Sequence, residues 1–135
     1  MRARDALGRP VPATSPEAVE PVPEEALPPE QAVATARALL AVGRAFSAHE
    51  VLEASWKAAP PDERPLWQGL AQVCVGMTHL QRGNAIGAAR LLRRGAGLLD
   101  GRPPAYDVDV PRVVVQARRL AAEIEAGQPG EAVTL

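Results

Sequence analysis

Hydrophobic residues recur every three or four positions through most of the chain after residue 30, which is the spacing of amphipathic helices. Glycines, prolines and capping residues divide this pattern into five runs. No segment alternates apolar and polar residues as a half-buried strand would. The predicted class is therefore all-α, a compact bundle of about five helices. The predicted helices cover residues 30–42, 47–59, 63–82, 85–99 and 110–126.

The third predicted helix is apolar on nearly every side. Leu66, Leu70 and Val73 follow helical spacing on one face, while Trp67 and Cys74 extend the apolar surface around the helix. A helix of this kind buries all of its faces against neighbours. We therefore expect it in the middle of the bundle, with Cys74 as a buried thiol.

Local signals mark the ends of these helices. Gly43 and Gly83 follow the last periodic residues and predict C-terminal stops. Asn84 and Asp109 precede apolar runs and predict N-caps. Ser47 stands three residues before a glutamate, which predicts a capping box at the start of the second helix.

The two glycine corners resemble each other in sequence. Residues 43–48 and 83–88 both join a glycine to a small residue at the start of the next helix. Two interpretations stay open at this point. The similarity is either a chance likeness of two helical corners or a pair of helical hairpins of the tetratricopeptide kind, although two such units are few for a stable array.

Both ends of the chain differ from the helical part. The first 29 residues hold seven of the fourteen prolines, with glutamates between them. Such a segment buries too little apolar surface to offset its ordering entropy. The predicted organisation is a disordered tail at 1–29, a helical domain at 30–126 and a disordered tail at 127–135.

Composition and charge exclude several classes of partner. The formal net charge is −1 and aromatic residues make up 3% of the chain, so nucleic acid finds neither a positive excess nor stacking side chains. The longest uncharged stretch is shorter than the roughly 20 residues of a membrane span. No secretory signal precedes the helices. These features predict a cytoplasmic protein without a membrane partner, and leave a protein partner or homo-oligomer open.

Polar side chains gather on the second and third predicted helices. His49, Glu53 and Trp56 lie at i, i+4 and i+7 on one face, and Gln68 and Gln72 begin a polar stripe that continues to the second histidine. An antiparallel packing of these two helices brings the stripes together. The set that we call the polar seam is His49, Glu50, Glu53, Trp56, Gln68, Gln72, His79, Arg82 and Asn84.

The segments HEVLEASW and LWQGLAQVCVGMTHLQRGNAIGAARLL make the chain similar to the domain-of-unknown-function family 309. Members of that family carry a His-Glu-x-x-Glu-x-x-Trp helix. It is followed by an apolar helix that contains Gln-Gly and ends in His, and then by an Arg-Gly-Asn-like turn. The resemblance covers about residues 33–125, implies a compact helical bundle and implies no established activity. Its matching positions are His49, Glu50, Glu53, Trp56, Gln68, Gly69, His79, Arg82, Gly83 and Asn84.

Two hypotheses account for the polar seam. In the first, the seam is a hydrogen-bond network that fixes helix register in a non-catalytic domain, with a possible role for the domain as a protein-interaction module. In the alternative, His49, Glu53 and His79 bind zinc, manganese or iron, and Glu50 is the general base of a hydrolase-type enzyme. A catalytic seam has to open into a cleft, whereas a structural one is sealed.

Overall fold

The computed structural model describes residues 2–135 and confirms an all-α fold. It has five helices, α1 (Pro29–Ala41), α2 (Ala45–Ala58), α3 (Arg64–Gln81), α4 (Ala85–Leu99) and α5 (Val110–Glu125). A short antiparallel hairpin of β1 (Arg2–Arg4) and β2 (Pro10–Pro12) precedes them. Within the described chain, no helix has the length and apolar surface needed to cross a bilayer.

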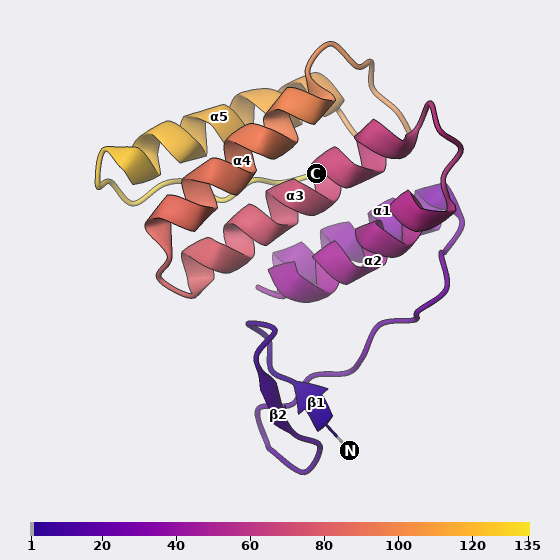
Figure 1. The fold of residues 1–135 in the computed structure, drawn as a ribbon, viewed down its shortest axis with the longest axis vertical. Helices are drawn as coiled ribbons and strands as arrows, with labels where there is room; N and C mark the ends of the chain where they lie inside the picture. The colour runs from indigo at the N-terminus through magenta and orange to yellow at the C-terminus, as the bar shows by residue number, and fades with distance from the viewer. Residues whose placement is uncertain (1) are drawn as a thin grey trace.

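The helices stack in the order of the chain (Figure 1). The main helix contacts join α1 with α2, α2 with α3, α3 with α4 and α4 with α5. The middle helix α3 buries residues on all sides, including Trp67 and Cys74, as its apolar pattern predicted. The C-terminal half of the polar stripe on α3 lies near the α3–α4 corner, because α3 ends there at Gln81.

Glycines allow α3 and α4 to approach each other closely. A Cβ atom on Gly95 of α4 would lie 2.8 Å from the carbonyl oxygen of Gly69 on α3. A Cβ atom on Gly76 would lie 2.8 Å from Cγ of Leu92. Both distances are below van der Waals contact, so the backbones pack where any larger residue would separate them. Gly69, which is part of the family motif, therefore has a packing role.

The two glycine corners have the same backbone structure. Gly43 has φ of +78° and Gly83 has φ of +81°, the left-handed region that favours glycine. In both corners the residue after the glycine donates its N–H to the carbonyl five residues earlier, at 2.8 Å. These bonds are those of a Schellman motif. The sequence similarity of residues 43–48 and 83–88 thus corresponds to two helical hairpins with matching corners.

The predicted caps are correct for two helices and wrong for one. The side chains of Asn84 and Asp109 accept hydrogen bonds from backbone N–H groups in the first turns of α4 and α5. The capping box at Ser47 does not form, because α2 begins at Ala45, directly after the glycine corner. Ser47 lies inside the first turn, where its hydroxyl accepts a hydrogen bond from Nη2 of Arg44 at 2.9 Å.

The segment before α1 has little regular structure, as predicted, but it is placed on the helices. We call residues 2–28 the N-terminal segment. Arg82 of the α3–α4 corner donates from Nε to the carbonyl of Leu7 at 2.8 Å, and Arg44 donates to the carbonyl of Glu20 at 2.5 Å. The prediction of a disordered tail is therefore supported only in part. Arginine side chains hold this segment through its backbone, which composition alone does not reveal.

Residues 126–135, which we call the C-terminal segment, also lie against the bundle. The segment turns back at the end of α5 and runs toward the middle of the molecule (Figure 1). Val133 is 2% exposed and belongs to the hydrophobic core. The disordered tail at 127–135, which was expected of a chain end, stays a prediction, and Val133 of this segment packs in the core.

Candidate functional site

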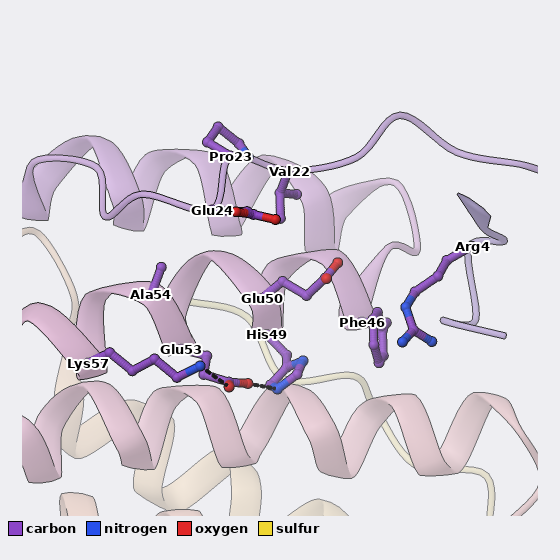
Figure 2. A pocket seen from close by; sticks show the side chains of 10 residues that line it. All are labelled: Arg4, Val22, Pro23, Glu24, Phe46, His49, Glu50, Glu53, Ala54 and Lys57. Carbon is purple, nitrogen blue, oxygen red and sulfur yellow. Dashed lines mark ion pairs between the residues drawn. The ribbon is translucent and has the colours of Figure 1, made fainter. Parts of the chain in front are cut away.

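Three ionisable side chains of α2 form a connected row. Nε2 of His49 lies 2.7 Å from Oε2 of Glu53, and Nζ of Lys57 lies 3.1 Å from Oε1 of the same carboxylate. The residues are four apart, so successive turns of one helix place them on one face. Figure 2 shows the two ion pairs as dashed lines along α2. We call His49, Glu53 and Lys57 the α2 charge row.

The charge row opens into a groove of about 540 Å³. One side of the groove is α2 and the other is the N-terminal segment (Figure 2). The α2 half of the polar seam is therefore not sealed inside the bundle. The residues that line the groove are Arg4, Val22, Pro23, Glu24, Phe46, His49, Glu50, Glu53, Ala54 and Lys57.

Glu50 lies in this groove without a partner. Its side chain points away from the charge row and toward the N-terminal segment (Figure 2). Among the side chains of residues 3–135, none forms a hydrogen bond or ion pair with its carboxylate. Burial raises the pKa of Glu50, and the nearby charges of His49 and Arg4 offset only part of that effect. A half-buried carboxylate without a partner stays partly desolvated, which costs the fold stability.

Glu53, one turn further along, is in the opposite electrostatic situation. Burial alone would raise the pKa of Glu53, but the hydrogen bond from Lys57 and the charge of His49 outweigh it and lower the pKa. Glu53 therefore stays ionised and is already paired. The two neighbouring carboxylates of the family motif thus differ, since one is satisfied within α2 and the other is not.

Phe46 connects the groove to the N-terminal segment. Its ring packs edge to face against His49 with centroids 5.3 Å apart, and the Arg4 guanidinium lies 5.0 Å from its centroid. The Arg82 guanidinium lies 5.8 Å from the same centroid. Gly8 lies so close that a Cβ atom there would be 2.3 Å from the Phe46 ring. The ring is therefore a platform on which the N-terminal segment rests.

The α3 part of the seam does not join the charge row. Nδ2 of Asn84 donates a hydrogen bond to Nδ1 of His79 at 3.1 Å, across the α3–α4 corner. Arg82 reaches the N-terminal segment, and Oε1 of Gln72 is buried without a hydrogen-bond partner among the described residues. Gln68 is half-buried. The stripes on α2 and α3 therefore make two separate groups of polar contacts.

The geometry gives no support to a metal site at His49, Glu53 and His79. No group of three histidine, cysteine or acidic side chains within residues 2–135 is close enough to hold one ion. His79 is engaged by Asn84 and His49 by Glu53. Nδ1 of His49 is buried and has no hydrogen-bond partner in the described part of the chain. The metal hypothesis stays a prediction that metal analysis of the purified protein decides.

The other candidate reactive groups are engaged or buried. The Ser55 hydroxyl donates to the carbonyl of Val51 at 3.4 Å, one turn earlier on α2. Cys74 is fully buried, and burial raises the pKa of its thiol to about 12. A thiol with that pKa is protonated and inert at neutral pH. Trp56 is half-buried and packs against the core.

The structure also brings to the site residues that the sequence analysis did not select. Lys57 completes the charge row, and its i, i+4 spacing from Glu53 is a signal that predicts the pair. Phe46 and Arg4 carry no such signal. Arg4 is distant in the chain and reaches α2 only through the fold of the N-terminal segment. Arginines on the opposite side of the bundle form exposed ion pairs, such as Arg118 with Asp100 at 3.3 Å.

Comparison with known proteins agrees with the motif. Residues 33–91 match a family described as "Domain of unknown function (DUF309)", over a shorter stretch than the predicted 33–125. The "Uncharacterized protein YpuF" of Bacillus subtilis (strain 168) is 36% identical over 63 residues. That alignment covers 46% of this chain and 36% of YpuF, so the chain matches about a third of the relative's length. No solved structure matches the chain at a significant level. The helical stretch 33–91, which covers most of α1, all of α2 and α3 and the first half of α4, is thus similar to the DUF309 family.

Proposed function

We propose that the chain is a non-catalytic protein-interaction module of the cytoplasm and that the groove on α2 is its partner surface. The occupant is a polypeptide segment that presents an arginine or lysine side chain to Glu50. The observation that supports this proposal best is the half-buried, unpaired Glu50 carboxylate in an open groove of about 540 Å³.

The groove is lined by the cations Arg4 and Lys57 as well as by acidic residues, and its unpaired carboxylates favour a cationic partner. Glu53 has both of its oxygens engaged within α2. Glu24 on the N-terminal segment and Glu50 have no ion-pair partner among the described side chains 3–135. A guanidinium or ammonium group that enters the groove gains charge-assisted hydrogen bonds to a carboxylate that is already partly desolvated. Such a pair costs less to form than one in which both groups must leave water.

The covering segment allows a partner to enter. Arg44 and Arg82 on the helices donate side-chain hydrogen bonds to backbone carbonyls of the N-terminal segment. Backbone contacts do not depend on the side chains of the segment that is held. A partner segment can therefore take over contacts of the same kind as the N-terminal segment shifts away from α2.

Site-specific photocrosslinking tests the proposal. A photoreactive amino acid replaces Ala54, which lines the groove, in the full chain produced in cells of the native host. The matched control has the same group at Ala38, an exposed position on α1. We expect one dominant protein adduct from position 54 and not from position 38. Glu50→Gln in the Ala54 variant should reduce the adduct at least tenfold, while Glu25→Gln on the exposed N-terminal segment should not change it.

The proposal fails if positions 54 and 38 give the same pattern of adducts. It also fails if the adduct from position 54 is insensitive to Glu50→Gln. In the second case the groove would be near a partner without using the carboxylate that we assign to it.

A further inference from the structure

The side chain of one glutamine on α5 binds the backbone at the end of the C-terminal segment. Nε2 of Gln116 donates to the carbonyl of Thr134 at 3.1 Å, and Oε1 of Gln116 accepts from the N–H of Thr134 at 3.0 Å. A side-chain amide thus pairs with both backbone groups of one residue, as a neighbouring strand would. Gln116 is only 7% exposed, so this buried amide is satisfied by the segment.

The residues on either side of Thr134 are held as well. Val133 is 2% exposed and belongs to the core. Arg37 of α1 donates from Nη2 and Nε to the carbonyl of Leu135 at 3.0 and 3.2 Å, and the Leu135 side chain packs on the core while partly exposed. The same guanidinium is fixed by the carbonyl of Asp107 at 2.7 Å.

These contacts have the properties of a site for an extended peptide. Gln116 and Arg37 bind backbone groups, which any residue supplies, and so contribute affinity without dependence on sequence. Specificity comes from the residues two apart, Val133 and Leu135, whose side chains meet the apolar core. An extended chain places residues i and i+2 on the same side, which is how Val133 and Leu135 can both contact the core.

The stretch that joins this segment to α5 is exposed, and the N–H of Gln128 in it donates to the carbonyl of Glu123 at 2.9 Å. Gly127 has φ of +72° and a Cβ atom there would meet nothing within 4 Å. Residues 125–129 are exposed. Arg119 pairs with Glu131 at 3.3 Å on the surface, where an ion pair contributes little. The exposed stretch gives residues 133–135 room to leave the bundle, at the cost of exposing Val133 and the Gln116 amide.

We propose that Gln116 of α5 and Arg37 of α1, with the part of the core that Val133 and Leu135 contact, form a peptide-binding site that residues 133–135 occupy in cis. The occupant in trans is an extended polypeptide segment with a valine-sized residue at the buried position and a leucine-sized residue two positions later. This site lies apart from the α2 groove and goes beyond the proposed function. Its test does not depend on whether the groove binds a partner.

A labelled peptide tests this site. The probe is a fluorescein-labelled, amide-capped peptide with the sequence of residues 130–135, GEAVTL. Two variants of the full chain open the site without altering the helices: Val133→Asp removes the buried side chain, and Thr134→Pro removes the N–H that Gln116 accepts. Fluorescence anisotropy measures binding, and far-ultraviolet circular dichroism measures helix content.

We expect saturable binding to both opened variants. The wild-type chain should bind at least tenfold more weakly, because its own segment competes at the millimolar effective concentration of a short tether. Gln116→Ala in the Val133→Asp background should weaken binding at least tenfold. A probe with aspartate in place of its valine should not bind.

Two results overturn the proposal. The first is an absence of probe binding by opened variants that keep the helix content of the wild type. The second is a loss of helix content in both opened variants, since residues 133–135 would then be an inseparable part of the core.

Discussion

The N-terminal segment meets the bundle through backbone carbonyls that arginines hold, whereas the C-terminal segment meets it through a buried side chain and a paired amide. In the first segment, the best-placed apolar residues, Val22 and Leu27, stay partly exposed. In the second, Val133 is 2% exposed. Both segments were predicted to be disordered, the first from its composition and the second as a chain end. The difference shows that the side chains of the first segment pack less deeply on the bundle than Val133 of the second.

The largest expected effect comes from the buried anchor of the C-terminal segment. Val133→Asp removes the contribution of a buried valine, so the free energy of unfolding should fall by roughly 1.5–3 kcal/mol. Val22→Asp is the matched change in the N-terminal segment and should cost less than about 1 kcal/mol, because that side chain is only partly buried. Urea unfolding followed by circular dichroism compares the two variants. Equal losses would remove the distinction between the segments.

The next effect concerns the arginine that holds the N-terminal segment. Arg82→Ala removes the hydrogen bond to the Leu7 carbonyl and the contact with the Phe46 ring, which together contribute about 1–2 kcal/mol. Hydrogen exchange measured by mass spectrometry should show faster exchange in residues 2–28 and no change in residues 131–135. Arg94→Ala, at an exposed position on α4, is the control and should change neither. Faster exchange at both ends would mean that Arg82 stabilises the whole bundle.

The pattern of apolar residues was sufficient to predict the five helices, and several of their ends also have a local signal. Asn84 and Asp109 cap as predicted, and the glycine corners occur where glycine stands. The predicted capping box at Ser47 was wrong, because the corner at Gly43 leads directly into α2. The helix begins at Ala45, so Ser47 lies inside its first turn and not before it.

The site was predictable only as far as its contacts are local. His49 and Glu53 pair because i, i+4 spacing on one helix brings them together. His79 was expected beside them, but its partner is Asn84, five residues later across the α3–α4 corner. Arg4, Gln116 and Arg37 were not predicted. Their partners are distant in the chain, and no periodic pattern encodes such contacts.

The charge row beneath the N-terminal segment gives a smaller, pH-dependent effect. The pKa of Glu53 is lowered in the folded state, so its contribution to stability is present above the ordinary value of 4.5 and is lost as the pH falls through the lowered pKa. Glu53→Gln should therefore reduce the free energy of unfolding at pH 7 by roughly 0.2–1 kcal/mol. The difference from wild type should disappear near pH 3. A difference that persists at that pH would have to come from packing instead of charge.

The smallest expected effect is that of replacing Glu50, and it tests the central claim most directly. The claim is that the α2 groove binds a partner and is not a structural seam. The pKa of Glu50 is raised in the folded state, so ionisation above that pKa destabilises the fold, and the penalty is absent at low pH, where the group is protonated. The measurement is the free energy of unfolding of Glu50→Gln beside wild type at pH 7 and pH 3. We predict that the variant is more stable at pH 7, by about 0.5 kcal/mol or less, and equal at pH 3. A variant less stable than wild type at pH 7 would contradict the account, because Glu50 would then be a structural member of the seam.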